Sequence, residues 1–265
     1  MKNLDIYCVT DKKLNFLEKT PLKLVGVGKE NFSEKYLRCD EKKNIYHKEK
    51  YYSELTFHYW YWKNLLSSEK KNWVGFCQKR RFWINPKKEQ SLITKENLNE
   101  FLLLEICKEM NEFESFLCNS ISVSGAKKIK IIKRGWKNLL KDPTILFDSG
   151  KHNISLHFDM HHGYKNLEKA INLLDNKNKQ DFFDFVNKKT DFNPHIMCIA
   201  TPAILEKWFE SLFSWLERCE AEFGFDDLKG YDTQRLYAYL AERYLSYWFK
   251  KYTKCRELPW TVIQI

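Results

Sequence analysis

The sequence predicts an α/β fold whose C-terminal third is helical. As far as Ala200, short apolar runs rich in β-forming residues alternate with helical patterns, and two long amphipathic patterns follow. Only 9 Gly and 6 Pro occur among the 265 residues, which argues against a turn-rich β-architecture. Aromatic residues make up 16% of the chain, more than a disordered chain carries. A chain of this length can bury one large core.

Three short apolar runs predict the strands of the first half. Leu4–Val9 opens the chain, Leu22–Val27 ends at Gly28, and Asn72–Cys77 follows later. Each run is rich in β-forming residues and is bounded by polar ones, as strands are. The polar stretch Asn31–Lys50 predicts a long loop between the second and third strands.

Two helical patterns lie in the same half. Ser53 is expected to cap a helix that runs to about Leu66, because a serine side chain can accept from the free amides of a first turn. Glu96–Leu117 carries a nearly unbroken apolar stripe, which predicts a long amphipathic helix.

The second half predicts two strands and then mainly helices. We expect strands over Lys128–Lys133 and Thr144–Phe147, whereas Asn153–His162 fits either a helix or a strand. The other expected elements are helices over 167–174 and 181–187, a buried strand over 195–200, a helix over 202–222 with Pro202 in its first turn, and a helix capped by Asp232 or Thr233 that reaches Tyr252.

The charge of the chain is unevenly distributed. Lys and Arg exceed Asp and Glu by 45 to 35, which gives a net charge of +10. From Glu206 to Ile265, ten acidic residues face nine basic ones, so the positive surplus precedes Glu206. We expect an anionic partner bound mostly by the earlier part of the chain: nucleic acid, acidic lipid or a phosphorylated small molecule.

Neither a leader peptide nor a disulfide framework is evident. The start, Met1–Tyr7, has no apolar core that ends in small residues, and no stretch reaches 18 apolar residues. The eight cysteines are scattered singly without a CxxC pair. We therefore expect a cytoplasmic protein whose thiols are reduced and mostly buried.

The run Lys79-Arg80-Arg81 is the sharpest candidate for an anion site. It follows the predicted strand Asn72–Cys77, and open α/β sheets bind ligands at the carboxyl ends of their strands. Guanidinium groups match phosphate oxygens bidentately. The alternative is an ordinary solvated basic surface.

Three further groups of residues carry possible chemistry. Glu54, Tyr59 and Lys63 share one predicted helix, where they either contact a ligand or serve the core and the helix dipole. In the His157-x-Asp159-x-His161 pattern, the imidazoles suit a metal or simple hydrogen bonding, and the carboxylate suits a general base. Glu242-Arg243 reads as a structural ion pair. Asp148, Glu54 and Glu242 are alternative bases.

Five segments together resemble DUF4422, a bacterial family found in capsular and lipopolysaccharide gene clusters and regarded as glycosyltransferases. Two of them, SELT followed by YWYWKN and the strand that ends in KRRF, are fairly specific. The matching segments are Val9–Lys12, Ser53–Thr56 with Tyr59–Asn64, Val74–Phe82, Asn193–Met197 and Leu240–Leu245.

This resemblance implies a single GT-A-like, Rossmann-like glycosyltransferase domain over residues 1–265. Residues 1–150 would mainly bind a nucleotide sugar, and 151–265 would supply the acceptor side and the C-terminal helices. Some relatives resemble galactofuranosyltransferases, which implies a UDP-sugar donor, an inverting reaction, and an oligosaccharide or capsule polysaccharide as acceptor. Transient association with capsule-assembly proteins at the inner membrane is also implied.

The resemblance also suggests roles for individual residues. No Asp-x-Asp pair occurs, so we expect cationic side chains to stabilise the leaving diphosphate without a required cofactor or metal. Asp159 is the favoured base and Glu242 the second. The residues expected to bind the nucleotide sugar are Thr10, Lys12, Glu54, Tyr59, Lys63, Lys79, Arg80 and Arg81, with Trp60 and Trp83 as further stacking groups. Those expected to contact the acceptor or sugar are His157, His161, Asn193 and Arg243.

Two other functions remain open on the sequence. Basic charge with interleaved aromatic residues also suits an RNA-binding module, although no RNP, KH or zinc-knuckle pattern is present and we expect no nucleic acid partner. A transferase that moves a phosphoryl or phosphoramidate-type group onto a capsule sugar would use the same phosphate pocket.

Overall fold

The first strand, β1 (Lys2–Thr10), lies at the centre of the sheet and packs on both sides. The computed structural model describes residues 2–67, 69, 72–88 and 92–265. Ile6 and Cys8 point to one apolar cluster, whereas Tyr7 and Val9 point to another. This alternation follows from the two-residue period of a strand, and a strand covered on both faces reads as a continuous apolar run.

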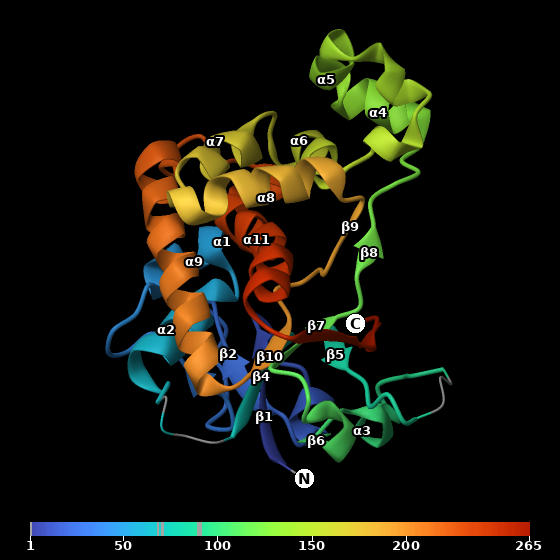
Figure 1. Ribbon diagram of the computed structural model, residues 1–265. Coiled ribbons are helices and arrows are strands. Elements are labelled where there is room, and N and C mark those ends of the chain that lie inside the picture. The colour runs from blue at the N-terminus through green and yellow to red at the C-terminus, as the bar shows by residue number, and fades with distance from the viewer. Residues whose placement is uncertain (1, 68, 70–71, 89–91) are drawn as a thin grey trace.

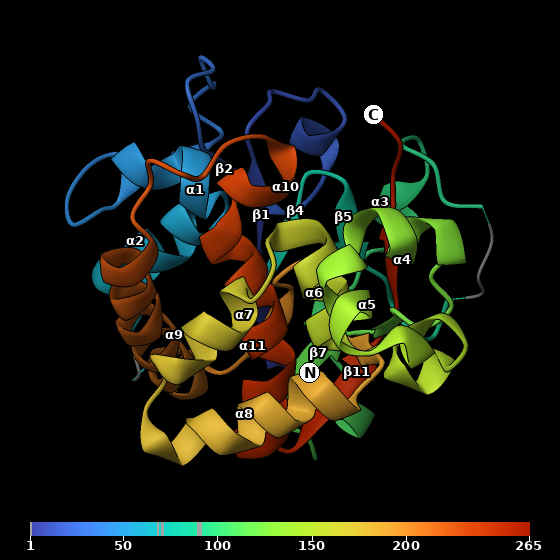
Figure 2. The ribbon, with the colours of Figure 1, turned by 90° about the horizontal axis from the view of Figure 1, so that it is seen from above.

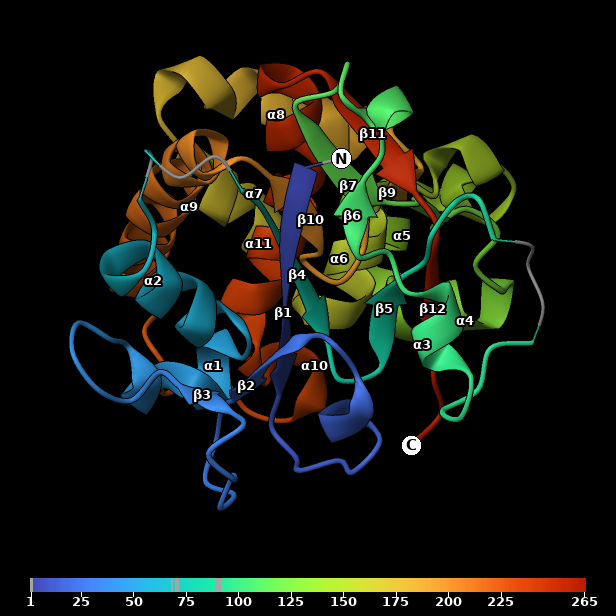
Figure 3. The same cartoon turned by 90° about the horizontal axis from the view of Figure 1, so that it is seen from below.

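The main sheet has the strand order β11-β7-β10-β4-β1-β2-β3. The strands after β1 are β2 (Lys23–Gly26), β3 (Leu37–Arg38), β4 (Trp73–Gln78), β5 (Arg81–Trp83), β6 (Glu105–Ile106), β7 (Ser115–Cys118), β8 (Ile121–Ser122), β9 (Asp191–Phe192), β10 (Cys198–Ala200), β11 (Cys255–Leu258) and β12 (Trp260–Val262). Strand β1 pairs in parallel with β2 and β4, while β10 runs antiparallel to β4 and β7. Seen from below, β4, β5 and β12 follow on one side of β1 (Figure 3).

Helices cover the sheet and make up most of the C-terminal third (Figure 1). The helices are α1 (Glu49–Tyr52), α2 (Leu55–Asn64), α3 (Leu98–Phe101), α4 (Lys128–Arg134), α5 (Trp136–Lys141), α6 (Ile154–His162), α7 (Asn166–Asn172), α8 (Asn176–Lys188), α9 (Pro202–Phe223), α10 (Tyr231–Gln234) and α11 (Leu236–Tyr252). Short 3-10 turns span Leu17–Lys19, Tyr46–Lys48, Lys108–Met110, Pro143–Leu146 and Ser149–Lys151.

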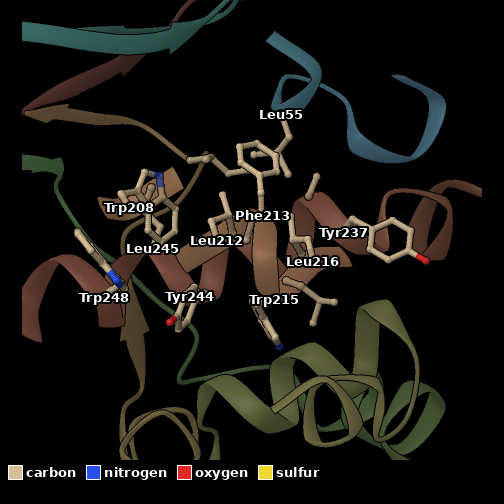
Figure 4. Packing of buried hydrophobic residues seen from close by; sticks show 14 of the residues in the cluster. Leu55, Trp208, Leu212, Phe213, Trp215, Leu216, Tyr237, Tyr244, Leu245 and Trp248 are labelled. Carbon is tan, nitrogen blue, oxygen red and sulfur yellow. The ribbon is translucent and has the colours of Figure 1, made fainter. Parts of the chain in front are cut away.

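The largest core lies where α9 and α11 pack beside the sheet (Figure 4). Trp208, Trp215 and Tyr244 are fully buried there. The Trp215 indole N–H donates to the carbonyl of Ala170 at 2.7 Å, so this buried polar atom is satisfied. The helices predicted over 202–222 and from Asp232 or Thr233 to Tyr252 form as α9 and α11, and the strands predicted over 4–9, 22–27 and 72–77 form as β1, β2 and β4.

The long helix predicted over Glu96–Leu117 is wrong. This segment forms the short helix α3, the strand β6, a 3-10 turn and the strand β7. Ile106 pairs with Lys2 of β1, and β7 is buried between β10 and β11. Its apolar residues are accounted for by sheet burial, because a short buried strand and a buried helix cannot be distinguished by apolar content alone.

Two predicted strands are also wrong. Lys128–Lys133 lies in helix α4, and Thr144–Phe147 lies largely in a 3-10 turn. The alternating lysines and isoleucines resemble a strand, but no strand pairs with this segment among the described residues, and only Ile131 of these isoleucines is buried. Asn153–His162, which fitted either state, forms helix α6, and Asn153 caps it by accepting from the amide of Leu156.

The predicted helix caps need correction as well. Ser53 has a φ of 51° and ends α1, whereas α2 begins after Glu54. Asp232 and Thr233 lie within the short helix α10, and Arg235 joins it to α11. The strand predicted over 195–200 is shorter, because His195 and Ile196 adopt positive φ angles of 70° and 51° that a strand does not allow.

All eight cysteines are free thiols, and six of them are buried, as the scattered spacing suggested. Across the described part of the chain, no helix combines the length and the apolarity needed to cross a bilayer.

Candidate active site

A polar pocket opens where the carboxyl ends of β1, β2 and β4 meet. Because β2 and β4 lie on opposite sides of β1, the strand order reverses here, and open α/β sheets bind ligands at such points. Helices α1 and α10 lie beside these strand ends (Figure 2). The polar side chains that line the pocket are Asp11, Glu49, Ser53, Glu54, Gln78, Lys79, Arg81 and Arg235.

The enclosed cavity is about 110 Å³. This is below the roughly 300–1,000 Å³ of sites that enclose a drug-sized ligand. The cavity therefore has room for part of a nucleotide sugar, and the surface around it would have to contribute the rest.

Two of the three consecutive cations reach this pocket. Lys79 lines it and forms an ion pair with Asp11, which follows β1. Arg81 also lines it and donates to the side-chain oxygen of Gln78 at 2.8 Å. Arg80 does not line the pocket, and its buried Nε has no hydrogen-bond partner among the described residues. Lys79 and Arg81 therefore lie beside the strand end, and their binding of a nucleotide sugar stays a prediction.

The turn after β1 brings Asp11 into the pocket but not its two neighbours. The Thr10 hydroxyl donates to the carbonyl of Lys12 at 2.6 Å and accepts from the amide of Lys12 at 3.0 Å. Thr10 is buried, and Lys12 is exposed. Both residues therefore shape the turn, although they were predicted as nucleotide contacts.

Glu54 is held in the pocket by Gln78. The Gln78 amide nitrogen donates to the Glu54 carboxylate and, at 2.8 Å, to the carbonyl of His195. Burial raises the pKa of Glu54 above its usual range, and the charge of Glu242 adds to this rise, while Ser53 lowers it by a hydrogen bond. The result is a fixed carboxylate of increased basicity.

Glu242 lies at the edge of this network. It accepts from the amide of His195 at 2.6 Å and forms an ion pair with Arg243. Burial lowers the pKa of Arg81, and the charges of Glu54 and Glu242 oppose that change. His195 has a positive φ. Its carbonyl accepts from Gln78, which holds Glu54, and its amide donates to Glu242, so it links the two carboxylates whose charges act on Arg81. Strained residues of this kind are often found at functional sites.

The sequence interpretation missed Arg235 and Glu49. Arg235 joins α10 to α11 and lines the pocket opposite the strand ends. Burial raises the pKa of Glu49, and the charge of Arg235 opposes this rise. The near-neutral charge after Glu206 directed attention away from that part of the chain, so no local signal identified Arg235.

The predicted acceptor contacts lie in two different environments. Arg243 is 1% exposed, and its guanidinium lies 3.9 Å from the ring centre of Phe192. Asn193 is fully buried and donates to the carbonyl of Cys118 at 2.6 Å. Both residues hold the fold together behind the pocket rather than facing a ligand.

His157 and His161 line a second pocket of about 200 Å³, together with Lys130 and His152. The two imidazoles stack with their centres 4.4 Å apart. Burial, supported by the charge of Arg243, lowers the pKa of His157 to about 2, so this ring is neutral at physiological pH.

Asp159 is placed away from both pockets. Its carboxylate accepts from the Asn138 side chain and the Lys165 amide, both at 2.8 Å. It therefore anchors α5 and the turn after α6, and it does not line either pocket. The favoured base from the sequence thus has a structural position.

The aromatic residues predicted to stack on a ligand belong to the core. Tyr59 packs edge-on against Phe213 of α9, and Lys63 lies over the ring of Trp62 at 3.0 Å. Trp60 and Trp83 are both buried. Tyr59 and Trp60 pack in the cluster that α2 shares with α9, whereas Trp83 of β5 packs in the cluster on the other face of the sheet.

Within the described ranges, no group of three or more His, Cys, Asp or Glu side chains is arranged to hold a metal ion. Of the acidic residues of the pocket, Asp11 pairs with Lys79, and Glu54 accepts from Gln78.

Comparison with known proteins gives one family and one fold. A family model described as "Domain of unknown function (DUF4422)" matches residues 5–254. A solved structure described as the apo form of the bifunctional glycosyltransferase WbbM is similar, with a TM-score of 0.71 and 19% identity. The match covers 100% of this chain and 46% of that chain, so this chain spans less than half of that protein. The likeness shows a shared fold and confirms the predicted α/β class. No curated protein matches the sequence significantly.

Proposed function

Because this chain belongs to the DUF4422 family and shares its fold with a solved glycosyltransferase, we propose that it is itself a glycosyltransferase. The donor is a nucleoside-diphosphate sugar, with UDP-galactofuranose as the first candidate. The acceptor is an oligosaccharide or growing capsular or lipopolysaccharide glycan. Residues 1–150 of the GT-A-like domain mainly bind the donor, and 151–265 contribute the acceptor side.

The observation that carries this proposal is the set of cations at the strand ends. Lys79 and Arg81, from the connection between β4 and β5, and Arg235, from the junction of α10 and α11, line one pocket at the point where the strand order reverses. A departing nucleoside diphosphate develops negative charge, and prearranged cations stabilise such charge without reorganising. Arg81 is suited to bidentate contact with phosphate oxygens. In this proposal these side chains make a divalent metal unnecessary.

The base in this proposal is Glu54. During an inverting displacement, the acceptor hydroxyl attacks the anomeric carbon and loses its proton to the carboxylate. The bond from that carbon to the diphosphate oxygen breaks, and the diphosphate leaves with the electron pair. Glu54 lines the pocket, is oriented by Gln78 and has a raised pKa, which suits proton abstraction. Asp159 lacks this placement, and Glu242 is already engaged with Arg243.

Titration calorimetry with UDP tests the donor site directly. We expect Arg81→Gln and Lys79→Gln each to weaken UDP binding at least tenfold, because each removes a cation from the diphosphate. Lys42→Gln is a matched control on an exposed loop and should bind UDP like the wild type. Unchanged UDP affinity in both pocket variants would remove this pocket from consideration.

A transfer assay tests the reaction class. Candidate UDP-sugars are supplied with a short capsule or lipopolysaccharide fragment, and the product mass is measured. A hexosyl increment supports the proposal, whereas a phosphoryl increment supports the other transferase. If EDTA abolished transfer and a divalent ion restored it, the metal-independent mechanism would be wrong.

A further inference from the structure

Residues 127–147 form a small helical lobe that projects from the body of the protein (Figure 1). The lobe contains α4, α5 and the 3-10 turn Pro143–Leu146. Ile131 and Ile145 turn inward and pack with Leu156 and Met160 of α6 in a separate apolar cluster. This cluster fixes which side of each helix faces the protein and which side faces outward.

The outward side carries a concentration of large apolar side chains. Ile129 and Ile132 are 63% and 51% exposed, Trp136 is 52%, Leu140 is 75% and Phe147 is 81% exposed. A helix turns about 100° per residue, so Ile129 and Ile132 lie about 60° apart on the side of α4 that faces away from Ile131. Scattered exposed apolar residues are ordinary, but a group such as this one marks an interaction surface.

The same surface is strongly and uniformly basic. Seven cations and no acidic residue occur between positions 127 and 141, and all seven cations are exposed. In the described part of the chain, Arg134 is the one member of this set with a carboxylate within ion-pair distance. The basic residues are Lys127, Lys128, Lys130, Lys133, Arg134, Lys137 and Lys141.

The acidic residues that follow are occupied locally. Asp142 forms an ion pair with Lys151 at 2.6 Å, and Asp148 accepts from the amide of Gly150 at 2.9 Å. Seven cations against these two carboxylates, one of which is paired with Lys151, leave the positive charge of α4 and α5 largely uncompensated. Lys128 lies 5.1 Å from the ring centre of Phe147, which places that exposed ring beside the basic start of α4.

From this combination we infer that the lobe docks on the surface of an anionic lipid bilayer. Apolar side chains that enter the acyl boundary beside lysines that contact anionic headgroups are the two components of interfacial membrane binding. Long lysine side chains can keep their charge at the headgroups while the helices lie flat. A nucleic acid would engage the cations but would leave Ile129, Ile132 and Leu140 exposed to water.

The lobe is connected to the edge of the candidate active site. Arg134 forms an ion pair at 3.1 Å with Asp232 of α10, and α10 leads directly into the pocket residue Arg235. Docking would thus hold the pocket near the bilayer, and, insofar as the proposed function applies, near an acceptor carried on a membrane lipid. The docking itself does not depend on the proposed activity.

Vesicle co-sedimentation tests the inference. The complete chain is mixed with vesicles of phosphatidylcholine alone or of phosphatidylcholine with 30% phosphatidylglycerol, a fraction of about one lipid in three. We expect binding to the anionic vesicles and at least tenfold weaker binding to the neutral ones. Lys128→Gln with Lys130→Gln and Lys133→Gln should weaken binding to anionic vesicles by about fivefold for each lysine removed.

Matched variants separate insertion from simple charge attraction. The triple change Ile132→Ser, Leu140→Ser and Phe147→Ser should weaken vesicle binding at least tenfold without altering net charge. Leu92→Ser, at an apolar residue that is 84% exposed elsewhere, is its control. Lys42→Gln with Lys43→Gln and Lys50→Gln controls for net charge. Circular dichroism should show that all these surface variants remain folded.

Several results would overturn the inference. These are wild-type binding to anionic vesicles by the apolar triple variant, equal loss of binding in the control variants, or no vesicle binding by the wild type. If light scattering showed a dimer that the apolar variant dissociates, while vesicles did not bind, a second copy would cover this surface instead. Binding of an oligonucleotide in place of vesicles would assign the surface to nucleic acid.

Discussion

The pocket at the strand ends and the α4–α5 lobe use positive charge in opposite ways. In the pocket, cations and acidic groups are mixed: Lys79 pairs with Asp11, Arg235 lies near Glu49, and the charges of Glu54 and Glu242 act on Arg81. In the lobe, seven cations are exposed and the segment 127–141 contains no acidic residue. The net charge of +10 therefore owes much more to the lobe than to the pocket.

This difference shows that the number of positive charges in a segment does not identify its role. A paired, half-buried cation has a fixed position and can stabilise charge at one point. An exposed, unpaired cation attracts any anionic surface and is screened by salt. The local run Lys79-Arg80-Arg81 drew attention in the sequence, but the denser basic segment lies in the lobe.

The largest expected effect is on the rate of transfer when the Glu54 carboxylate is replaced. Glu54→Gln should lower the rate of transfer by about 10²–10⁴-fold, because a glutamine cannot accept the acceptor proton. The side chain keeps its size and its oxygen toward Gln78, so the fold should persist. Single-turnover assays measure the effect, and Asp159→Asn serves as the comparison, with a loss below tenfold. A larger loss in Asp159→Asn than in Glu54→Gln would reverse the assignment.

The same carboxylate should set the acid limb of the pH profile. Glu54 acts as a base only when ionised, so activity is lost as the pH falls through its raised pKa, and this limb should lie above the ordinary carboxyl value of 4.5. Rates measured from pH 4 to 8 test this. A limb centred at or below pH 4.5 would contradict the role of burial at Glu54.

Arg81 should have the next largest effect. Arg81→Gln is expected to reduce transfer by about 10²–10³-fold, since it removes a prearranged donor from the leaving group. Arg81→Lys keeps the charge but loses the bidentate guanidinium, so its transfer rate should lie between those of the wild type and Arg81→Gln. Comparison of the two variants at saturating donor measures the value of bidentate contact. Equal rates for wild type and Arg81→Gln would exclude the residue from the reaction.

Binding by the lobe and binding by the pocket should respond differently to salt. Raising the ionic strength from about 0.1 M to 1 M shortens the Debye length from about 10 Å to 3 Å. The exposed lobe should lose at least tenfold in affinity for anionic vesicles, whereas UDP affinity in the half-buried pocket should fall by less. Co-sedimentation and calorimetry measure the two responses. A steeper fall for UDP would show that the pocket cations are solvent-screened.

The smallest expected effect concerns pH and stability in the core beneath the pocket. His58 is buried between Phe76 and Phe209, and burial lowers its pKa to about 3 from the usual 6.5. Below pH 6.5 the unfolded chain binds a proton at His58 that the folded chain does not bind. The contribution of His58 to the free energy of unfolding is therefore present above pH 6.5 and is lost as the pH falls below it. The loss approaches about 1.4 kcal/mol per pH unit once the pH is well below 6.5.

Urea unfolding at pH 6.5 and 5.5 measures this contribution. Wild type should lose about 1 kcal/mol more than His58→Leu over that interval, because the unfolded histidine is already half protonated at pH 6.5. Lobe variants such as Lys133→Gln should follow the wild type, because lysine does not titrate in that range. Identical pH dependence in wild type and His58→Leu would mean that His58 is protonated in the folded protein.

Much of the fold followed from periodicity. The residues predicted on the apolar side of α9, among them Trp208, Leu212 and Trp215, are buried. Strands β1 and β4 form where the sequence has apolar runs. In these segments the spacing of the apolar residues fits only one type of secondary structure. The segment 96–117 failed because its apolar residues are buried by pairing with β1, β10 and β11, which lie far away in the sequence.

The candidate site was predictable only where a strand end carried it. Lys79 and Arg81 follow β4, and the rule for strand ends in α/β sheets placed them correctly. Glu54 was identified through the family resemblance and a helix start. Asp159 and Asn193 carried suitable chemistry but are held by hydrogen bonds to distant backbone and side-chain groups. Arg235 gave no local signal.

The sequence by itself determined the apolar stripes of α9 and α11, the positions of β1, β2 and β4, and which segment carries uncompensated charge. These properties depend on neighbours within a few turns or residues. The tertiary structure alone decided that Glu54, Gln78, Arg81 and Arg235 share one pocket, and that the apolar side of the lobe stays uncovered. Burial and ion pairing arise between segments far apart in the chain, so only their packing could settle them.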